Sequence, residues 1–354
     1  MRILLISAKA DHPNGGIAIW TKHYSDACKN LDGFSCDLVN VALTGRRASC
    51  ATARRSMIDE ISRTWGIFRQ LNEKLSNISY DVAHLNTSIG TFGIVRDYFI
   101  ARRVARKGVP VVLHFHCDIP KWVTNCIVKH FLAKILKVSR VNLVLCDNSK
   151  RYLRDAFGVD SVKLPNFVDG NMIASSKEIH DHVQKVLFVG RVSVDKGAEE
   201  IFELAKLLPH SDFLLAGEVS NEVASWECPG NVVFLGIQEH DAVMSSLDDA
   251  DVFFFPSHTE GFSLALAEAM ARGVPAIATD VGANAEMLEN QGGIVVPVGD
   301  IPTMEMAFEQ IDEFNLRKKM SAWNLKKVRE RYETKQVMRV LTQTYENVME
   351  KNGK

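Results

Sequence analysis

The chain has 354 residues, of which 46% are hydrophobic and 24% charged, and its formal net charge at pH 7 is −1. This length exceeds that of a typical domain with one hydrophobic core, so we expect two domains of roughly 150 to 180 residues each. No apolar run approaches the ~18 residues that a transmembrane helix needs, which argues against an integral membrane protein. Because Met1 and Arg2 lead directly into an apolar strand, we expect no signal peptide and a cytoplasmic protein.

The charge is unevenly distributed along the chain. Residues 1–168 contain 25 lysines and arginines against 13 aspartates and glutamates, whereas residues 169–354 contain 17 against 30. A basic first half predicts an anionic surface or acceptor as its partner. Nucleic acid is disfavoured, because the sequence contains no recognisable nucleic-acid-binding module and does not interleave its basic residues with aromatics.

Apolar runs alternate with helical patterns in two successive sets. In the first half we expect strands at residues 3–7, 37–42, 82–85, 111–115 and 143–146. In the second half we expect strands at residues 186–190, 212–216, 232–235, 251–255, 276–278 and 293–296. Strands spaced by helices are typical of βαβ units and parallel sheets. The pattern therefore predicts an α/β protein with two Rossmann-like domains that face one cleft.

The hinge between the domains is expected within residues 165–184, where a Pro-Asn turn precedes a polar stretch. We therefore place the first domain at residues 1–167 and the second at residues 168–335. A segment that is helical by composition, residues 336–354, closes the chain.

Two glycines, Gly15 and Gly16, follow the first strand and precede a helix that contains Trp20. Glycines at this position let the backbone approach a phosphate or a sugar closely, although a tight turn is the commoner reason for them. The segment is not Gly-x-Gly-x-x-Gly, so the usual signature of nicotinamide binding is absent.

His116 closes the strand at 111–116 and opens a loop at its carboxyl end, where ligands of parallel sheets bind. His114 lies two residues earlier on the same face. No third ligand at a suggestive spacing supports a metal site here, and His114 is better explained as a satisfied core histidine.

The segment from Lys121 to Arg140 has the pattern of an amphipathic helix. Five apolar residues recur in it at helical spacing beside five basic residues, and they are Ile127, Val128, Phe131, Leu132 and Ile135. Such a helix suits the surface of an anionic membrane. The alternative is an ordinary amphipathic helix packed on its own sheet. A second basic cluster favours the interpretation as a membrane-surface helix over the packing role. It is formed by Arg96, Arg102, Arg103, Arg106 and Lys107.

In the second half, the strand at 186–190 ends in Gly190 and Arg191, and Lys196 follows within one loop. Because the carboxyl ends of parallel strands open onto the ligand crevice, we expect both cations to meet a diphosphate.

The strand at 252–255 runs into a loop that delivers Glu260 to the start of a helix. The amides of Phe262, Ser263 and Leu264 lack helical partners there, so the helix start favours a phosphate. Glu268, about two turns into the helix, can accept hydrogen bonds from a diol such as a ribose. The alternative for the two glutamates is a solvated acidic pair.

Four motifs in this order resemble those of the GT-B-fold retaining glycosyltransferases of family 4. They are Gly15-Gly16, Pro165 to Asp169, the pair Gly190-Arg191 and Lys196-Gly197, and Glu260 to Glu268 with the loop Gly261-Phe262-Ser263-Leu264. The resemblance covers nearly the whole chain and is most specific between Lys185 and Pro297. It implies an acceptor-binding first domain, a nucleotide-sugar-binding second domain, and a last helix that crosses back onto the first.

The resemblance further implies transfer of a hexose-type sugar, with retention, from a nucleotide diphosphate sugar to a hydroxyl of a glycan or lipid-linked glycan in surface polysaccharide assembly. UDP is the favoured nucleotide. The catalytic residues would be His116, Arg191, Lys196 and Glu260. The donor would be held by Gly15, Gly16, Gly190, Ile237, Gly261, Phe262, Ser263, Leu264 and Glu268.

We expect neither a metal nor a cofactor. Arg191, Lys196 and the helix start can neutralise the leaving diphosphate by themselves. Asp249 and Asp251 form an Asp-x-Asp pattern, but they begin a strand. The seven cysteines form no Cys-x-x-Cys pair and no regular spacing, which argues against zinc and against a disulfide framework.

Three other classes share parts of this pattern. A sugar-nucleotide epimerase of the same architecture should carry more titratable groups around the anomeric site than His116 and Glu260. A phosphorylase-like enzyme would need a lysine for pyridoxal phosphate, and no such signature is visible. A non-catalytic nucleotide-sugar binding protein has little reason to keep Arg191, Lys196, Glu260 and Glu268 together. The sequence leaves the base, the sugar, the acceptor and the oligomeric state open.

Overall fold

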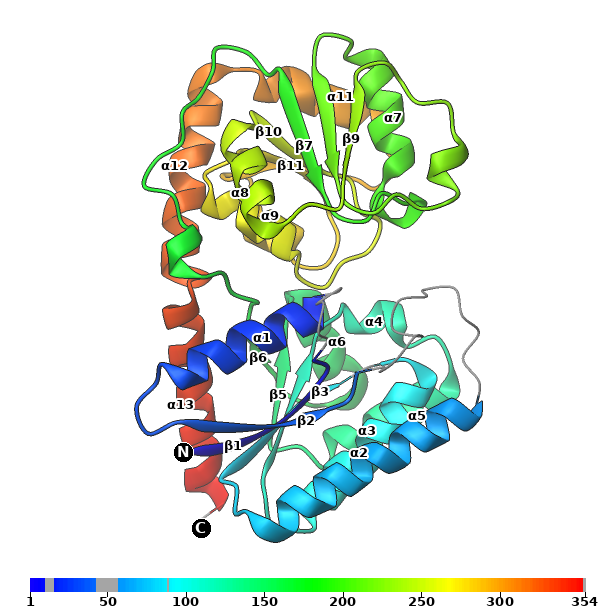
Figure 1. Cartoon of the computed structure of the whole chain (residues 1–354), viewed down its shortest axis with the longest axis vertical. Helices are drawn as coiled ribbons and strands as arrows, with labels where there is room; N and C mark the ends of the chain where they lie inside the picture. The colour runs from blue at the N-terminus through cyan, green and yellow to red at the C-terminus, as the bar shows by residue number, and fades with distance from the viewer. Residues whose placement is uncertain (10–15, 43–56, 88, 353–354) are drawn as a thin grey trace. The chain divides into compact units, whose positions relative to one another are not determined.

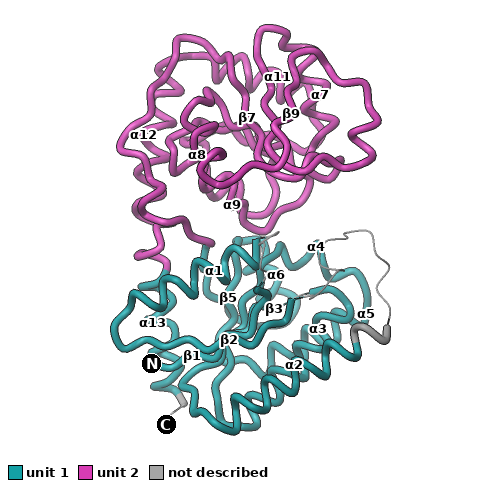
Figure 2. The backbone as a smooth tube through the Cα atoms, viewed as in Figure 1, with its two compact units in different colours: residues 1–165, 338–354 teal, residues 166–337 magenta. Residues whose placement is uncertain are grey.

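The computed structural model describes residues 1–9, 16–42, 57–87 and 89–352, and these form two compact units. Unit 1 comprises residues 1–165 and 338–354, and unit 2 comprises residues 166–337, as Figure 2 shows in different colours. The chain thus crosses between the units after residues 165 and 337. The boundaries expected from the sequence lie after residues 167 and 335.

Unit 1 contains a six-stranded parallel sheet in the order β2-β1-β3-β4-β5-β6. Its strands are β1 (Arg2–Ser7), β2 (Ser35–Asn40), β3 (Val82–Thr87), β4 (Val111–Phe115), β5 (Val141–Val144) and β6 (Val162–Lys163). β3 and β4 are buried along their whole length, as expected for central strands that helices cover on both faces.

Seven helices belong to the described part of unit 1, the last of which enters it from unit 2. They are α1 (Gly16–Lys29), α2 (Met57–Asn77), α3 (Thr91–Ala105), α4 (Ile119–Trp122), α5 (Cys126–Leu136), α6 (Asp147–Phe157) and α13 (Thr334–Asn352). In Figure 1, α2, α3 and α5 gather on one side of the sheet, and α1 and α13 lie on the other.

The two faces of the unit 1 sheet differ because neighbouring residues of a strand point to opposite sides. Leu85 on β3 belongs to the apolar core beneath α2, α3 and α5. His84, its neighbour, points the other way, and its Nδ1 lies 2.7 Å from the hydroxyl of Tyr345 on α13. The Tyr345 hydroxyl is also 3.0 Å from that of Tyr24 on α1. This face is therefore a buried polar layer that binds α13 to the sheet.

Burial keeps the groups of this layer uncharged. It lowers the pKa of His84 to about 3 and raises the pKa values of Tyr24 and Tyr345 well above their ordinary range. His84 Nε2 lies 3.0 Å from Asn86 Oδ1, so both ring nitrogens have a partner. The hydrogen bonds among His84, Tyr24 and Tyr345 favour one packing arrangement, because any other would leave these polar atoms without partners.

Unit 2 contains a second six-stranded parallel sheet, in the order β12-β11-β10-β7-β8-β9. Its strands are β7 (Lys185–Val189), β8 (Asp212–Ala216), β9 (Val232–Gly236), β10 (Val252–Phe255), β11 (Ala276–Thr279) and β12 (Gly293–Val296). Because β8 lies on one side of β7 and β10 on the other, the chain order reverses between β7 and β10. The carboxyl ends of two such strands form the usual ligand crevice of an open α/β sheet.

Helices cover the sheet of unit 2, and three short 3-10 helices lie in its loops (Figure 1). The helices are α7 (Ala198–Leu207), α8 (His240–Asp249), α9 (Leu264–Ala271), α10 (Asn284–Leu288), α11 (Ile301–Ile311) and α12 (Phe314–Arg331). The 3-10 helices are η1 (Gly170–Met172), η2 (Val194–Lys196) and η3 (Val223–Ser225).

The predicted α/β class, with two Rossmann-like parallel sheets, is confirmed. The sequence pattern missed β6, because this two-residue strand is exposed on both residues and carries no apolar run. Within the described ranges, none of the helices combines the length and apolar character needed to cross a membrane.

The single amphipathic helix predicted for residues 121–140 is wrong. Lys121 belongs to α4, and α5 starts only at Cys126, where the Asn125 side chain caps it by accepting a hydrogen bond from the Val128 amide at 2.9 Å. Three residues of the expected apolar stripe, Val128, Leu132 and Ile135, are buried in the core of unit 1. The ordinary packing role therefore applies to these three residues, whereas Ile127 is 49% exposed.

Candidate functional site

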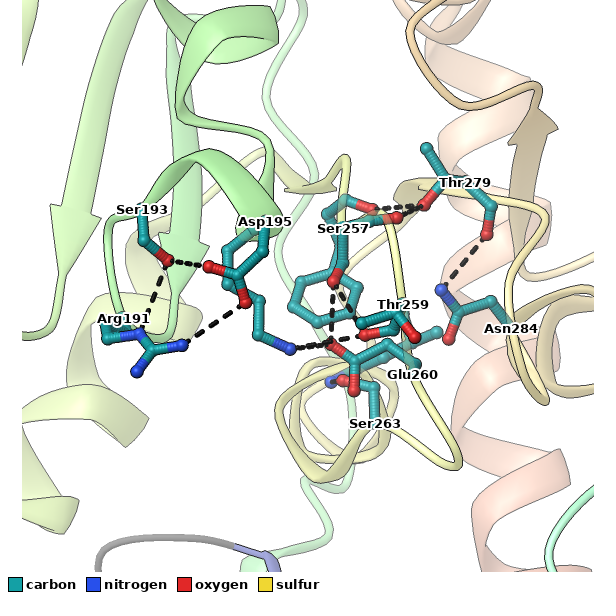
Figure 3. Close-up of polar contacts among 12 residues, drawn as sticks. Arg191, Ser193, Asp195, Ser257, Thr259, Glu260, Ser263, Thr279 and Asn284 are labelled. Carbon is teal, nitrogen blue, oxygen red and sulfur yellow. Dashed lines mark hydrogen bonds and ion pairs between the residues drawn. The ribbon is translucent and has the colours of Figure 1, made fainter. Parts of the chain in front are cut away.

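The loops that follow β7 and β10 bring together Lys196 and Glu260, two of the predicted site residues. Lys196 Nζ lies 2.6 Å from Glu260 Oε1, and the two side chains are only 24% and 14% exposed. The Ser257 hydroxyl donates to the same Glu260 oxygen at 2.9 Å, and Lys196 Nζ lies 3.4 Å from the carbonyl oxygen of Thr259. Figure 3 shows Glu260 with Ser257 and Thr259 beside it. The carboxylate is thus fixed from two sides by donors.

Arg191 lies in the same loop as Lys196 but is more exposed. Its Nη2 is 3.3 Å from Asp195 Oδ2, and its Nε is 3.4 Å from the Ser193 hydroxyl, which donates to Asp195 Oδ1 at 2.6 Å (Figure 3). Burial by itself would raise the pKa of Asp195, but the Ser193 hydrogen bond and the charges of Arg191 and Lys196 hold it below its ordinary value. These contacts use only part of the five-donor guanidinium, which leaves donors for an anionic ligand.

Gly197 allows the two loops to touch. Its φ of +84° lies in the left-handed region, and a Cβ at this position would lie 2.4 Å from the carbonyl oxygen of Pro256. The amide of His258 donates to the carbonyl oxygen of Asp195 at 3.0 Å and so joins the same two loops. A side chain at residue 197 would therefore separate Lys196 from Glu260.

Gly190 and Gly217 show that the loop after β8 also lies at this edge of the sheet. Gly190 follows β7, and its amide donates to the carbonyl oxygen of Ala216 at 2.9 Å. A Cβ on Gly217 would lie 1.9 Å from the Gly190 carbonyl oxygen. The sequence analysis did not single out Gly217, although its position directly after an apolar strand is a usable signal.

Helix α9 begins beside Glu260, as the sequence predicted. Ser263 is its N-cap, and its hydroxyl accepts a hydrogen bond from the Leu266 amide at 3.1 Å. Ala267 is the first residue whose amide bonds to a backbone carbonyl of the same turn, that of Ser263 at 3.1 Å. The helix satisfies no amide before Leu266, so the amides of Phe262, Ser263 and Leu264 occupy the positions at which helices bind anions. Phe262 itself is buried against the ring of Tyr332.

Glu268 is a half-buried residue of α9, and burial raises the pKa of its carboxyl group to about 7. It can therefore change its charge near neutral pH. Ile237 directly follows β9 and is 79% exposed, so its side chain is accessible for contact with a planar base. Gly261 connects Glu260 to α9, and its carbonyl oxygen accepts a hydrogen bond from the Ala283 amide at 3.0 Å.

Three further polar contacts support the loop after β10, and the sequence analysis missed all three. His258 Nε2 lies 2.6 Å from Oε1 of Glu200, a residue of α7 that is only 5% exposed. The Thr279 hydroxyl donates to the Ser257 carbonyl oxygen, and Asn284 Nδ2 donates to the Thr279 carbonyl oxygen at 3.1 Å (Figure 3). His258 was visible in the loop sequence, but nothing in the sequence paired it with Glu200.

The remaining predicted residues belong to unit 1. His116 follows β4, and its ring centre lies 3.9 Å from that of His114 and 5.1 Å from that of Trp20. His114 is fully buried, and burial, followed by the nearby His116 and His84, holds its pKa well below the ordinary value. Gly16 begins α1, whereas Gly15 lies outside the described residues.

His114 is buried as expected, but it is not the satisfied core histidine that the sequence predicted. Neither of its ring nitrogens has a hydrogen-bond partner among the described residues. Across residues 1–9, 16–42, 57–87 and 89–352, no group of three His, Cys, Asp or Glu side chains is arranged to hold a metal ion.

Two family models match the chain on either side of the unit boundary. The model described as Glycosyltransferase Family 4 matches residues 15–171, and the model described as Glycosyl transferases group 1 matches residues 172–326. A phosphatidyl-myo-inositol mannosyltransferase of Mycobacterium leprae is 27% identical over 270 residues, which cover 72% of this chain and 71% of that protein.

Two solved structures share the fold over almost the whole chain. Sucrose-phosphate synthase from Thermosynechococcus elongatus matches with a TM-score of 0.80 and 16% identity, over 98% of both chains. Anabaena HepE in complex with UDP-glucose matches with a TM-score of 0.72 and 15% identity, over 98% of this chain and 100% of that one. At these identities the likeness shows the fold alone.

Proposed function

Because this chain belongs to glycosyltransferase family 4, we propose that it transfers a hexose-type sugar, with retention of the anomeric configuration, from a nucleotide diphosphate sugar to a hydroxyl group. The favoured donor carries UDP, and the acceptor is a glycan or lipid-linked glycan in surface polysaccharide assembly. The observation that carries the proposal is the Lys196–Glu260 pair, which lies at the switch point of unit 2 beside Arg191 and the start of α9.

The leaving diphosphate requires the most stabilisation. When the bond between the anomeric carbon and the phosphate oxygen breaks, negative charge moves onto the diphosphate, so interactions there must strengthen in the transition state. Arg191 and Lys196 supply positive charge, and the amides of Ser263 and Leu264 supply hydrogen bonds. Since these groups already provide compensation, the reaction needs neither a metal ion nor a cofactor.

Glu260 orients the donor sugar in this mechanism. Its Oε1 is occupied by Lys196 and Ser257, so Oε2 is the oxygen that accepts a hydrogen bond from a sugar hydroxyl. A carboxylate held by two donors keeps its direction without further ordering when the sugar binds, which is the advantage of a preorganised site. The same charge stabilises positive character that develops on the sugar ring.

Glu268 and Ile237 hold the nucleoside in the proposal. The Glu268 carboxylate accepts hydrogen bonds from the ribose diol, and Ile237 packs against the base. UDP is supported by the bound UDP-glucose named for the Anabaena structure of the same fold. His116 is assigned to a contact with the donor sugar on the family resemblance alone.

The basic surface of unit 1 supports an acceptor with a lipid part. The mycobacterial relative is named for a lipid acceptor, phosphatidyl-myo-inositol. A peripheral contact of residues 121–140 with an anionic membrane would use their basic side chains together with the exposed Trp122 and Ile127, because Val128, Leu132 and Ile135 are buried and Phe131 is partly buried. Binding to anionic vesicles at low salt should therefore weaken when Ile127 is replaced by Ser.

The donor class is tested by calorimetric titration of the purified protein with UDP, GDP and ADP, each without metal and then with magnesium. We expect UDP to bind selectively and with the same affinity in both conditions. Selective binding of GDP or ADP would show that the donor carries guanine or adenine in place of uracil. Dependence of binding on magnesium would overturn the metal-independent mechanism. Incubation of the donor without acceptor is the second arm, because an epimerase would convert the sugar under these conditions.

A further inference from the structure

Unit 1 has a pocket at the edge of its sheet opposite to His116. The pocket has a volume of about 500 Å³ and lies where α3 and α5 end and β4 begins. β4 starts at Val111, which lines the pocket, whereas His116 follows the other end of the same strand. The volume falls within the range of pockets that bind small ligands.

The polar lining of this pocket is strongly basic. Its charged members are Arg102, Arg106, Lys137 and Arg140, and no aspartate or glutamate lines it. Arg102, Arg106 and Lys137 form no ion pair with any residue of the described ranges. The pocket therefore collects three positive charges that no carboxylate of the described ranges pairs with.

The negative ends of helix dipoles offset only part of this positive charge. Two helices end at the pocket, and each carboxyl end carries about half a negative charge, which gives about one in total against the three cations Arg102, Arg106 and Lys137. In addition, Arg102 and Arg106 are spaced four residues apart, so two like charges face each other on one side of the chain, an arrangement that disfavours the helix. An anion bound between them would relieve this repulsion.

The walls of the pocket are fixed by the backbone. The Arg140 amide donates to the Val111 carbonyl oxygen at 2.8 Å, and the Ala83 amide donates to the Pro110 carbonyl oxygen at 2.9 Å. α3, which contains Arg102 and is followed directly by Arg106, packs against α5, which is followed directly by Lys137 (Figure 1). The basic side chains thus extend from a rigid frame, and Val109, Pro110 and Val138 add apolar surface to it.

We propose that this pocket binds a phosphate-bearing anion, either the headgroup of an anionic lipid or a soluble phosphorylated compound. Guanidinium groups match phosphate oxygens in pairs, so Arg102 and Arg106 hold the phosphate, and Lys137 and Arg140 add charge from the α5 side. The apolar wall contacts the part of the ligand next to the phosphate. The site is separate from the proposed donor site in unit 2 and does not depend on its assignment.

The test uses a double variant, Arg102→Gln with Arg106→Gln, which removes two charges and keeps side chains of similar polarity. The matched control is Lys150→Gln with Arg151→Gln, which removes two exposed cations from α6 of the same unit. Because all four residues are exposed, both variants should melt at the temperature of the parent protein.

Each protein is titrated calorimetrically with inorganic pyrophosphate in the presence of saturating UDP. Each is also sedimented with vesicles of phosphatidylcholine alone or mixed with phosphatidylglycerol, at about 50 mM salt. We expect the pocket variant to bind one of these probes at least about tenfold more weakly than the parent, and the control variant to bind both nearly as the parent does.

The probe that loses affinity identifies the source of the phosphate. Loss of pyrophosphate binding assigns the pocket to soluble phosphorylated compounds, and loss of binding to phosphatidylglycerol vesicles alone assigns it to a lipid headgroup. The proposal is overturned if the parent binds neither probe, or if the pocket variant and the control variant lose affinity equally.

Discussion

Lys196 Nζ lies 2.6 Å from Glu260 Oε1 although 64 residues separate them in the sequence. The pair forms because β7 and β10, which are not consecutive, are neighbours in the sheet, and their loops therefore leave from adjacent positions. Both side chains are mostly buried, so the attraction between them is screened less than at an open surface. The pair thus fixes the position of a cation, which would contact the diphosphate of the proposed donor, and of an anion, which would contact its sugar.

Replacing Lys196 by Ala should lower kcat by about one to two decades, because a charge-assisted hydrogen bond contributes about 1.5 to 3 kcal/mol. The reason is the loss of positive charge beside the leaving diphosphate. Lys206→Ala, which removes an exposed lysine from α7, is the control and should leave turnover unchanged. Near-normal turnover of Lys196→Ala in steady-state assays would remove the central assignment of the proposed mechanism.

Arg191→Ala should reduce kcat/KM by about one to two decades while changing the free energy of unfolding by less than about 1 kcal/mol. The stability effect is small because the Arg191–Asp195 pair is about half exposed on both sides. Asp195→Asn is the matched variant, since it breaks the same ion pair but keeps the cation. If Asp195→Asn lost as much activity as Arg191→Ala, the ion pair and not the charge of Arg191 would be the important feature.

Glu268 should make folding stability depend on pH. Burial raises the pKa of its carboxyl group to about 7, above the ~4.3 of an unfolded chain. Between about pH 4 and pH 7 the unfolded chain therefore releases this proton first, so its contribution to stability falls as the pH rises and levels off above pH 7. Glu268→Gln should be more stable than the parent at pH 8, by at most about 4 kcal/mol, and not at pH 4. Urea unfolding at both pH values measures this, with Glu203→Gln on the exposed face of α7 as control.

The same titration tests the ribose role of Glu268. Uridine is the suitable ligand, because it carries the ribose without a phosphate group that titrates near the same pH. Its affinity should increase between pH 6 and pH 8 as the carboxylate forms, and Glu268→Gln should bind it weakly at both. Unchanged affinity of the variant would show that Glu268 does not contact the ribose.

Gly197→Ala should disrupt the site more than the size of a methyl group suggests. The left-handed backbone costs a non-glycine residue about 1 to 3 kcal/mol, and the new Cβ would also overlap the carbonyl oxygen of Pro256. We expect a lower melting temperature and a large loss of activity. Gly230→Ala in the same unit should be nearly neutral, because nothing lies within 4 Å of the added carbon. Equal effects of the two substitutions would contradict the close approach of the loops.

Tyr345→Phe should destabilise the protein by about 1 to 3 kcal/mol, because it removes one hydroxyl that serves both Tyr24 and His84 in a buried layer. Chemical unfolding measures the loss. Tyr152→Phe on α6 is the control, since it also removes a single phenolic hydroxyl in unit 1 but lies outside this layer. A difference of less than a few tenths of a kcal/mol between the variants would show that the layer contributes little.

The sequence predicted the sheets well because both are built from apolar strands with clear periodicity. It placed Lys196 and Glu260 in loops at the same edge of the sheet, through the rule that carboxyl ends of parallel strands meet there, but it did not predict that the two side chains pair. It could not pair His258 with Glu200, because Glu200 lies on a helix whose facing residues depend on packing. It also predicted one helix over residues 121–140, because helical spacing cannot reveal that one helix ends at Trp122 and that Asn125 caps a new helix, which starts at Cys126.

Helix α13 determines the order in which unit 1 is assembled. Unit 1 consists of residues 1–165 and 338–354, so the whole of unit 2 is synthesised between its two parts. At roughly 5 to 20 residues per second, His84 would wait on the order of ten seconds or more on the ribosome before Tyr345 is made. The unit that leaves the ribosome first is therefore the last to be completed, and residues 1–165 expressed alone would lack the helix that closes their polar layer.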